Sequence, residues 1–151
     1  MSLPIVAVAS DHGGFDLKTI LAVELNRLGY PLLDLGTDST ESVDYPDYAQ
    51  RMAAALHEKQ ATFGVLLCGT GIGISIAANR FPWIRAALIH DALGARLSRQ
   101  HNDANVICMG GRTIGPDLAK DCLQIFLTTV FEGGRHARRI AKMSPADEMS
   151  V

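Results

Sequence analysis

A cysteine stands at the end of an apolar run and is followed at once by a glycine-rich turn. The segment is Cys68-Gly69-Thr70-Gly71-Ile72-Gly73, and the apolar residues 63–67 precede it. Backbone N–H groups of such a turn can bind phosphate or another oxyanion, and a positive local potential favours a thiolate. These residues therefore suit proton or group transfer on an anionic substrate. A strand-to-helix turn after a buried structural cysteine explains this segment alone equally well.

The turn matches neither of the two common phosphate-binding patterns. A P-loop continues with Gly-Lys-Ser or Gly-Lys-Thr, whereas Ile74 and Ser75 follow here. The dinucleotide-binding pattern needs a third glycine at the position of Ile74. Nucleotide binding is therefore only a minor alternative.

Two further clusters place a histidine beside a carboxylate or an amide. Asp11 and His12 follow the first apolar run directly and could bind sugar hydroxyls or phosphate, although an N-cap aspartate beside a surface histidine is the simpler explanation. His101 and Asn102 follow a segment of helical period. A lone histidine at a helix end is usually only solvated, but an imidazole transfers protons near neutral pH, and the loop of His101 could reach the crevice of Cys68.

A basic segment near the end of the chain could clamp a phosphate. Arg135 and Arg139 are one helical turn apart on a single face. Guanidinium groups bind phosphate in a bidentate manner. A solvated basic face is the more common explanation of such a run.

The elements that must hold these residues alternate along the chain. Short apolar runs predict strands at residues 5–9, 32–35, 63–68, 84–89 and 106–109. Helical periodicity predicts helices at residues 17–28, 45–59, 72–80, 92–100, 116–130 and 135–142. We therefore predict an α/β fold, a Rossmann-like three-layer α/β/α sandwich with a five-stranded parallel sheet. Ligands bind beyond the carboxyl ends of such strands, so the loops after the first, third and fifth strands should carry the function.

Length and composition fit one globular domain over residues 1–151. The chain has 48% apolar and 20% charged residues and a net charge of −2, which does not favour nucleic acid as a partner. Cys68, Cys108 and Cys122 form no zinc-binding or disulfide pattern, so we expect a reducing cytoplasm. No leader or membrane-spanning run of about 18 apolar residues is present in the sequence, so we expect neither secretion nor a membrane partner.

Taken together, five ordered segments resemble the ribose-5-phosphate isomerase type B family, which includes the galactose-6-phosphate isomerase subunits. The resemblance covers nearly the whole chain. The segments are Ser10-Asp11-His12-Gly13-Gly14-Phe15, Asp44-Tyr45-Pro46-Asp47-Tyr48-Ala49, residues 68–79 beginning with Cys68-Gly69-Thr70-Gly71, residues 97–105 with His101-Asn102-Asp103, and Glu132-Gly133-Gly134-Arg135-His136.

The resemblance implies an aldose-ketose isomerase that interconverts D-ribose 5-phosphate and D-ribulose 5-phosphate, a reaction of the pentose phosphate pathway. Cys68 is then the base that moves a proton between C1 and C2 through a cis-enediolate, and His101, aided by Thr70, opens the furanose ring. The implied substrate-binding residues are Asp11 and Asn102 for sugar hydroxyls, Gly69, Gly71, Ile72 and Gly73 for the enediolate oxygens, and His12, Arg112, Arg135 and Arg139 for the phosphate.

The resemblance also implies a homodimer, or a dimer of such dimers, with an active site shared between subunits. Residues 1–131 would form the sandwich, and residues 132–151 a C-terminal helical arm that extends to the partner subunit. Proton transfer beside a carbonyl needs no redox cofactor, and we expect neither a cofactor nor a metal. Two alternatives stay open: an isomerase of a hexose 6-phosphate such as allose or galactose 6-phosphate, and a non-catalytic protein that binds a sugar phosphate or nucleotide.

Overall fold

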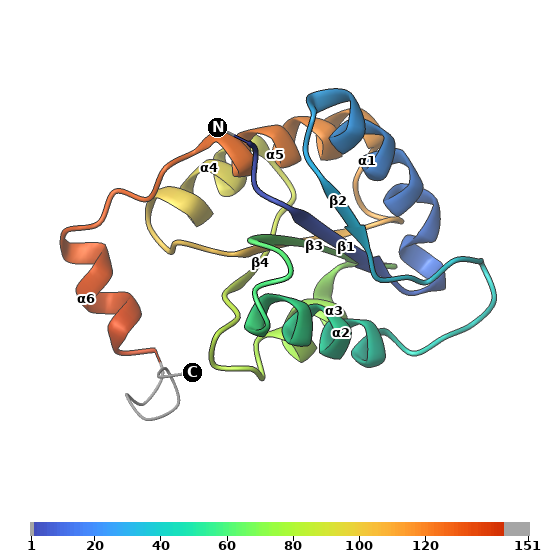
Figure 1. Ribbon diagram of the computed structural model, residues 1–151, viewed down its shortest axis with the longest axis horizontal. Helices are drawn as coiled ribbons and strands as arrows, with labels where there is room; N and C mark the ends of the chain where they lie inside the picture. Colours follow the sequence, from blue (N-terminus) through green and yellow to red (C-terminus); the bar gives the residue numbers. More distant parts are fainter. Residues whose placement is uncertain (1, 144–151) are drawn as a thin grey trace.

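The structure is a computed structural model that describes residues 2–143, and its strands and helices alternate along the chain (Figure 1). The strands are β1 (Val6–Ser10), β2 (Leu32–Asp34), β3 (Phe63–Cys68), β4 (Ala86–Leu88) and β5 (Val106–Gly110). The helices are the short 3-10 helix η1 (His12–Gly14), α1 (Phe15–Leu28), α2 (Tyr45–His57), α3 (Ile72–Ala78), α4 (Ala92–Gln100), α5 (Pro116–Thr128) and α6 (Arg135–Ala141).

Each predicted element is present, but the fourth strand is shorter than the sequence predicted. The N–H of Ile84 donates to the carbonyl of Phe81 in a turn, so the strand does not begin there. It begins at Ala86, whose N–H and carbonyl both bond to the side-chain amide of Asn79. Apolar composition alone does not separate a turn of this kind from a strand.

The five strands form one parallel sheet in the order β2-β1-β3-β5-β4. Helices α1, α4 and α5 lie on one side of the sheet in Figure 1, and α2 and α3 lie on the other. The buried residues divide in the same way into two clusters, one with Leu21 and Phe126 and one with Met52 and Ile74. The predicted Rossmann-like three-layer sandwich is therefore confirmed.

The connections of β1 and β3 leave in opposite directions. From β1 the chain continues to β2 on one side, and from β3 it continues toward β4 and β5 on the other. Such a switch opens a crevice between the two carboxyl ends, the usual ligand position in an open α/β sheet. Asp11 and Cys68 stand at the two sides of this crevice.

Helix α6 stands apart from the three layers in Figure 1. Its linker is bonded to the end of α4: Arg99 Nε donates to the carbonyl of Thr129 at 3.4 Å, and the N–H of Glu132 donates to the carbonyl of Gln100 at 3.0 Å. The predicted arm over residues 132–151 is described only as far as residue 143, and residues 144–151 lie outside the described part. Within the described residues, no helix combines the length and apolar character needed to cross a membrane.

Candidate active site

Three loops meet at the edge of the sheet where β1, β3 and β5 end. The N–H of Gly111 donates to the carbonyl of Cys68, and the N–H of Arg112 to that of Gly69, both at 2.9 Å. Gly13 lies between these loops: a Cβ placed on it would be 3.0 Å from the Gly69 nitrogen, and one on Gly111 would be 2.5 Å from the Gly13 carbonyl oxygen. The glycines are needed because the backbones approach so closely.

Cys68 is the last residue of β3 and is 5% exposed. The N–H of Gly71 donates to its Sγ at 3.1 Å. Gly71 has a φ of 77°, and a Cβ there would lie 2.6 Å from Leu88 Cδ1, so only glycine fits. The exposed Thr70 stabilises the same turn by accepting a hydrogen bond from the N–H of Ile72 at 3.2 Å. The turn thus directs an N–H group at the sulfur.

The other two cysteines are poorly placed for chemistry. Cys108 lies within β5 and Cys122 within α5, and both are fully buried. Burial, aided by the nearby Cys68, raises the pKa of Cys108 far above its ordinary value. Burial also raises the pKa of Cys122 to about 11. Neither thiol forms a useful thiolate near neutral pH.

Asp11 and His12 lie across the crevice from the cysteine turn, and both also have structural contacts. Oδ1 of Asp11 caps η1 by accepting from the N–H of Gly14 at 3.1 Å, as the N-cap explanation of the sequence predicted. Nδ1 of His12 lies 3.2 Å from the backbone of Val43. If Nδ1 accepts from the Val43 N–H, then Nε2 carries the proton and can donate to a substrate.

Arg112 and Tyr45 border the glycine turn on its open side. Nη1 of the exposed Arg112 would be 3.3 Å from a Cβ on Gly69, so the guanidinium lies over the turn. The ring of Tyr45 would be 2.7 Å from a Cβ on Gly73. In the sequence, Tyr45 belongs to one of the resembling segments, but no pattern there predicts a role for it. It is 39% exposed, so an apolar ring and a hydroxyl that can form hydrogen bonds both stand beside the turn.

His101 and Asn102 lie at the opposite edge of the sheet. They follow α4 and lead into the start of β5, where Val106 pairs with Gly64, whereas Cys68 pairs with Gly110 at the other end. Four residues of a parallel strand span about 13 Å. The expectation that this loop could reach the crevice of Cys68 is therefore not met within one chain, because α4 carries the loop back along the sheet.

A partly buried charge network clamps this loop, and the sequence did not predict it. Asp103 has a φ of 45° and accepts from Arg99 Nη1 at 2.8 Å and from Arg85 Nη2 at 3.3 Å. Arg85 Nε also donates to the carbonyls of Asn102 and Asp103. Arg99, only 8% exposed, lies over the rings of Phe63 and Phe126. The sequence gives no sign that arginines so far apart share one carboxylate.

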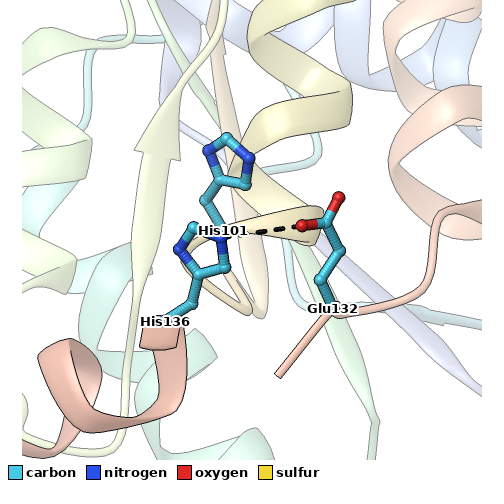
Figure 2. A group of neighbouring side chains, drawn as sticks. All are labelled: His101, Glu132 and His136. Atoms are coloured by element: carbon cyan, nitrogen blue, oxygen red, sulfur yellow. Dashed lines mark ion pairs between the residues drawn. The ribbon is translucent and has the colours of Figure 1, made fainter. Parts of the chain in front are cut away.

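Helix α6 brings further basic and titratable groups to the same end of the molecule. Arg135 and Arg139 are exposed, as expected for residues that bind something outside this chain. The ring of His136 is stacked on that of His101, and Glu132 lies beside both (Figure 2). Burial, together with the neighbouring His101 and Arg135, lowers the pKa of His136. A cavity of about 360 Å³ lies between the loop after α4 and the end of α6, with Asn102 and Ile140 on its wall.

His101, Glu132 and His136 are also the described residues that most resemble a metal site, since their ligand atoms lie within 4.8 Å of one another. The two imidazole planes, however, differ by only 13°. Nitrogen lone pairs lie in the ring plane, so those of stacked rings run side by side and do not converge on an ion about 2.1 Å from each. The group therefore fits a stacked pair better than a chelate.

Comparison with known proteins decides the family. A family model described as Ribose/Galactose Isomerase matches residues 6–143. The chain belongs to that family. This confirms the resemblance found in the sequence and the expected enzyme class, an aldose-ketose isomerase acting on a sugar phosphate.

Individual members of the ribose/galactose isomerase family match almost end to end. A putative sugar phosphate isomerase of Bacillus subtilis is 46% identical over 97% of this chain and 99% of its own length. Ribose-5-phosphate isomerase B of Escherichia coli is 43% identical over 95% of this chain and 96% of its own. The crystal structure of a ribose 5-phosphate isomerase from Thermotoga maritima has a TM-score of 0.91 at 50% identity, covering 92% of this chain and 96% of that one.

Proposed function

We propose that this isomerase interconverts D-ribose 5-phosphate and D-ribulose 5-phosphate, with Cys68 as the base. The observation that carries the proposal is the position of Cys68: a thiol at the end of β3, bonded by the Gly71 N–H and facing a glycine turn under Arg112. Relatives named ribose-5-phosphate isomerase B support the choice of sugar.

The proposed chemistry is a proton transfer beside a carbonyl. The Cys68 thiolate takes the proton from C2 of the open-chain aldose, and the N–H groups of Gly69, Gly71, Ile72 and Gly73 bind the enediolate oxygens as charge develops. The thiol returns the proton to C1 while a hydroxyl proton passes from O2 to O1, which gives the ketose. No electron leaves the sugar, so the step balances without a redox cofactor.

Substrate binding divides between the two edges of the sheet. At the cysteine edge, we assign Asp11 to a sugar hydroxyl and His12 and Arg112 to the phosphate. Thr70, in the cysteine turn, aids ring opening. The remaining residues that the proposal requires lie at the opposite edge or on α6. They are His101 for ring opening, Asn102 for a hydroxyl, and Arg135 and Arg139 for the phosphate.

We infer that a second copy of the chain supplies the residues of the opposite edge. Cys68 and His101 cannot meet within one chain, because the length of the sheet separates them. A twofold dimer solves this by placing the His101 edge and α6 of one subunit over the Cys68 edge of the other. The C-terminal arm that begins at residue 132 then reaches the sandwich of the partner subunit. Three free, buried cysteines agree with a reducing cytoplasm.

Isotope exchange tests the proposal. We expect the protein to wash deuterium from C2 of labelled ribose 5-phosphate into water, and Cys68→Ala to lose this exchange while phosphate still binds. Cys122→Ala is the matched control, because its thiol lies within α5 and packs in the buried cluster on the other side of the sheet from Cys68. Near-normal turnover by Cys68→Ala would show that the base is elsewhere. A panel that includes allose and galactose 6-phosphates tests the hexose alternative, and a lack of exchange with all sugars would favour a non-catalytic binding protein.

A further inference from the structure

His136 is a buried histidine that the proposed chemistry does not use, and its ring lies flat against that of His101. The ring centroids are 4.3 Å apart and the planes differ by 13° (Figure 2). His136 is 6% exposed, and its backbone N–H donates to the carbonyl of Gly133. One face of the His101 ring is therefore covered by a side chain from another element, α6.

Glu132 connects the two histidines through both its backbone and its side chain. Its N–H donates at 3.0 Å to the carbonyl of Gln100, the residue before His101. Its Oε2 lies 3.6 Å from Nε2 of His136. This buried nitrogen has no hydrogen-bond partner within the described residues, and the Glu132 carboxylate lies just beyond hydrogen-bond distance of it. The end of α4 and the start of α6 are thus held together at the His101 ring.

We propose that His136, oriented by Glu132, is a positioning residue that holds the ring of His101 in the plane required for opening the sugar ring. The inference rests on the proposed function, in which His101 performs that step. The terminal torsion of a histidine side chain is broad and poorly fixed by itself. A flat neighbour at stacking distance removes most of that freedom, and proton transfer is sensitive to small errors in donor position.

The charges around the pair also suit a His101 that gains and loses a proton. The groups that face His136 are His101 on α4 and Glu132, Arg135 and Arg139 around the start of α6. Burial keeps His136 neutral near pH 7 by lowering its pKa. The face of a neutral ring attracts a cation, whereas two stacked imidazolium rings would repel each other. A neutral His136 can therefore support either protonation state of His101.

The two substrates of the proposed reaction distinguish a defect in ring opening by His101 from a defect in proton transfer by Cys68. Ribose 5-phosphate exists mainly as a closed ring and needs opening. Ribulose 5-phosphate is open-chain, because its O5 carries the phosphate and cannot close a five-membered ring. Uptake of deuterium at C1 of ribulose 5-phosphate in heavy water needs Cys68 but not His101. A defect in ring opening should therefore affect only the first substrate.

The experiment measures both reactions in four full-length variants, after urea unfolding has shown that each is folded. We expect His136→Ala to lower kcat for ribose 5-phosphate about 10- to 100-fold and Glu132→Gln to lower it about 3-fold. In both variants the rate of deuterium uptake into ribulose 5-phosphate should stay within about 2-fold of the wild-type rate. His136→Phe keeps a flat ring and should recover most of the lost kcat. Arg138→Ala, an exposed neighbour on α6, is the matched control and should change neither reaction.

Two results would overturn the proposal. Equal losses in both reactions of a folded His136→Ala would show a general effect on the active site, and failure of His136→Phe to rescue would show that stacking is not what His136 provides. Absence of C1 exchange in the wild-type protein itself would instead refute the proposed function, and the positioning role with it.

Discussion

Complementation between two inactive variants tests the shared active site directly. Cys68→Ala removes the proposed base, and His101→Asn removes the group that opens the ring. In one chain these residues stand at opposite ends of paired strands about 13 Å long, so a working site must take Cys68 from one subunit and His101 from the other. Each variant alone should be inactive toward ribose 5-phosphate, because each of its sites lacks one of the two groups.

Mixing the two variants should restore activity to a level that symmetry sets. In a mixed dimer, one site receives both defects and the other receives neither. Random reassociation makes about half of the dimers mixed, and half of their sites are intact, so activity should reach about a quarter of the wild-type value. The assay unfolds equal amounts of both proteins together in urea, refolds them, and measures isomerisation of ribose 5-phosphate.

Separate refolding of each variant, followed by mixing without denaturant, is the control for subunit exchange. Activity that stays at zero after joint refolding, with both variants folded and mixed dimers demonstrated by a tag on one subunit, would refute the shared site. Substantial isomerisation by His101→Asn alone would do the same, because a site would then function without that residue.

Two further predictions concern stability. Asp103→Asn should lower the free energy of unfolding by about 1–2 kcal/mol, since it weakens a charge-assisted bond to the buried Arg99 and a more exposed one to Arg85. Asp103→Ala should cost about 1 kcal/mol more because of the φ of 45°, which Asp103→Gly would relieve. Each 1 kcal/mol of lost stability lowers Tm by about 2–4 °C. Equal Tm values for Asp103→Ala and Asp103→Gly would contradict the contribution of the backbone conformation. The second prediction uses the lowered pKa of His136: the folded state binds this proton less readily than the unfolded chain, so stability is present above the ordinary pKa of 6.5 and falls as the pH drops below it. Between pH 7 and pH 5, urea unfolding should show a smaller decrease in the free energy of unfolding for His136→Phe than for the wild type. An identical decrease in both proteins would show that His136 is not responsible.

Local pattern predicted the framework because the relevant forces act along short stretches of chain. Apolar runs such as residues 63–68 must be buried on both faces, and they alternate with helical periods that cover them. That alternation permits little except a parallel sandwich. The exception, the start of β4 at Ala86, depends on the side chain of Asn79 bonding to a strand residue, which no local pattern predicts.

Part of the candidate site could be predicted for the same reason. In a parallel sheet, residues at or just beyond the ends of strands share one edge, so the sequence alone predicts that Asp11, Cys68 and Arg112 lie together. The loop of His101 follows a helix, and the direction of that helix carries it to the other edge. The order of motifs along the chain does not give direction across the sheet, so the sequence wrongly predicted this histidine within reach of the thiol of the same chain.

The sequence by itself determined the fold class, the family and the residue types available for chemistry, because these depend on periodicity, on turn chemistry and on five ordered motifs. Only the tertiary structure decided which of those residues can meet. It separated Cys68 from His101 by the length of the sheet, and it joined Arg85, Arg99 and Asp103 into one clamp. It also stacked His136 on His101. These relations come from packing between elements far apart in the chain, where spacing along the sequence carries no information about distance.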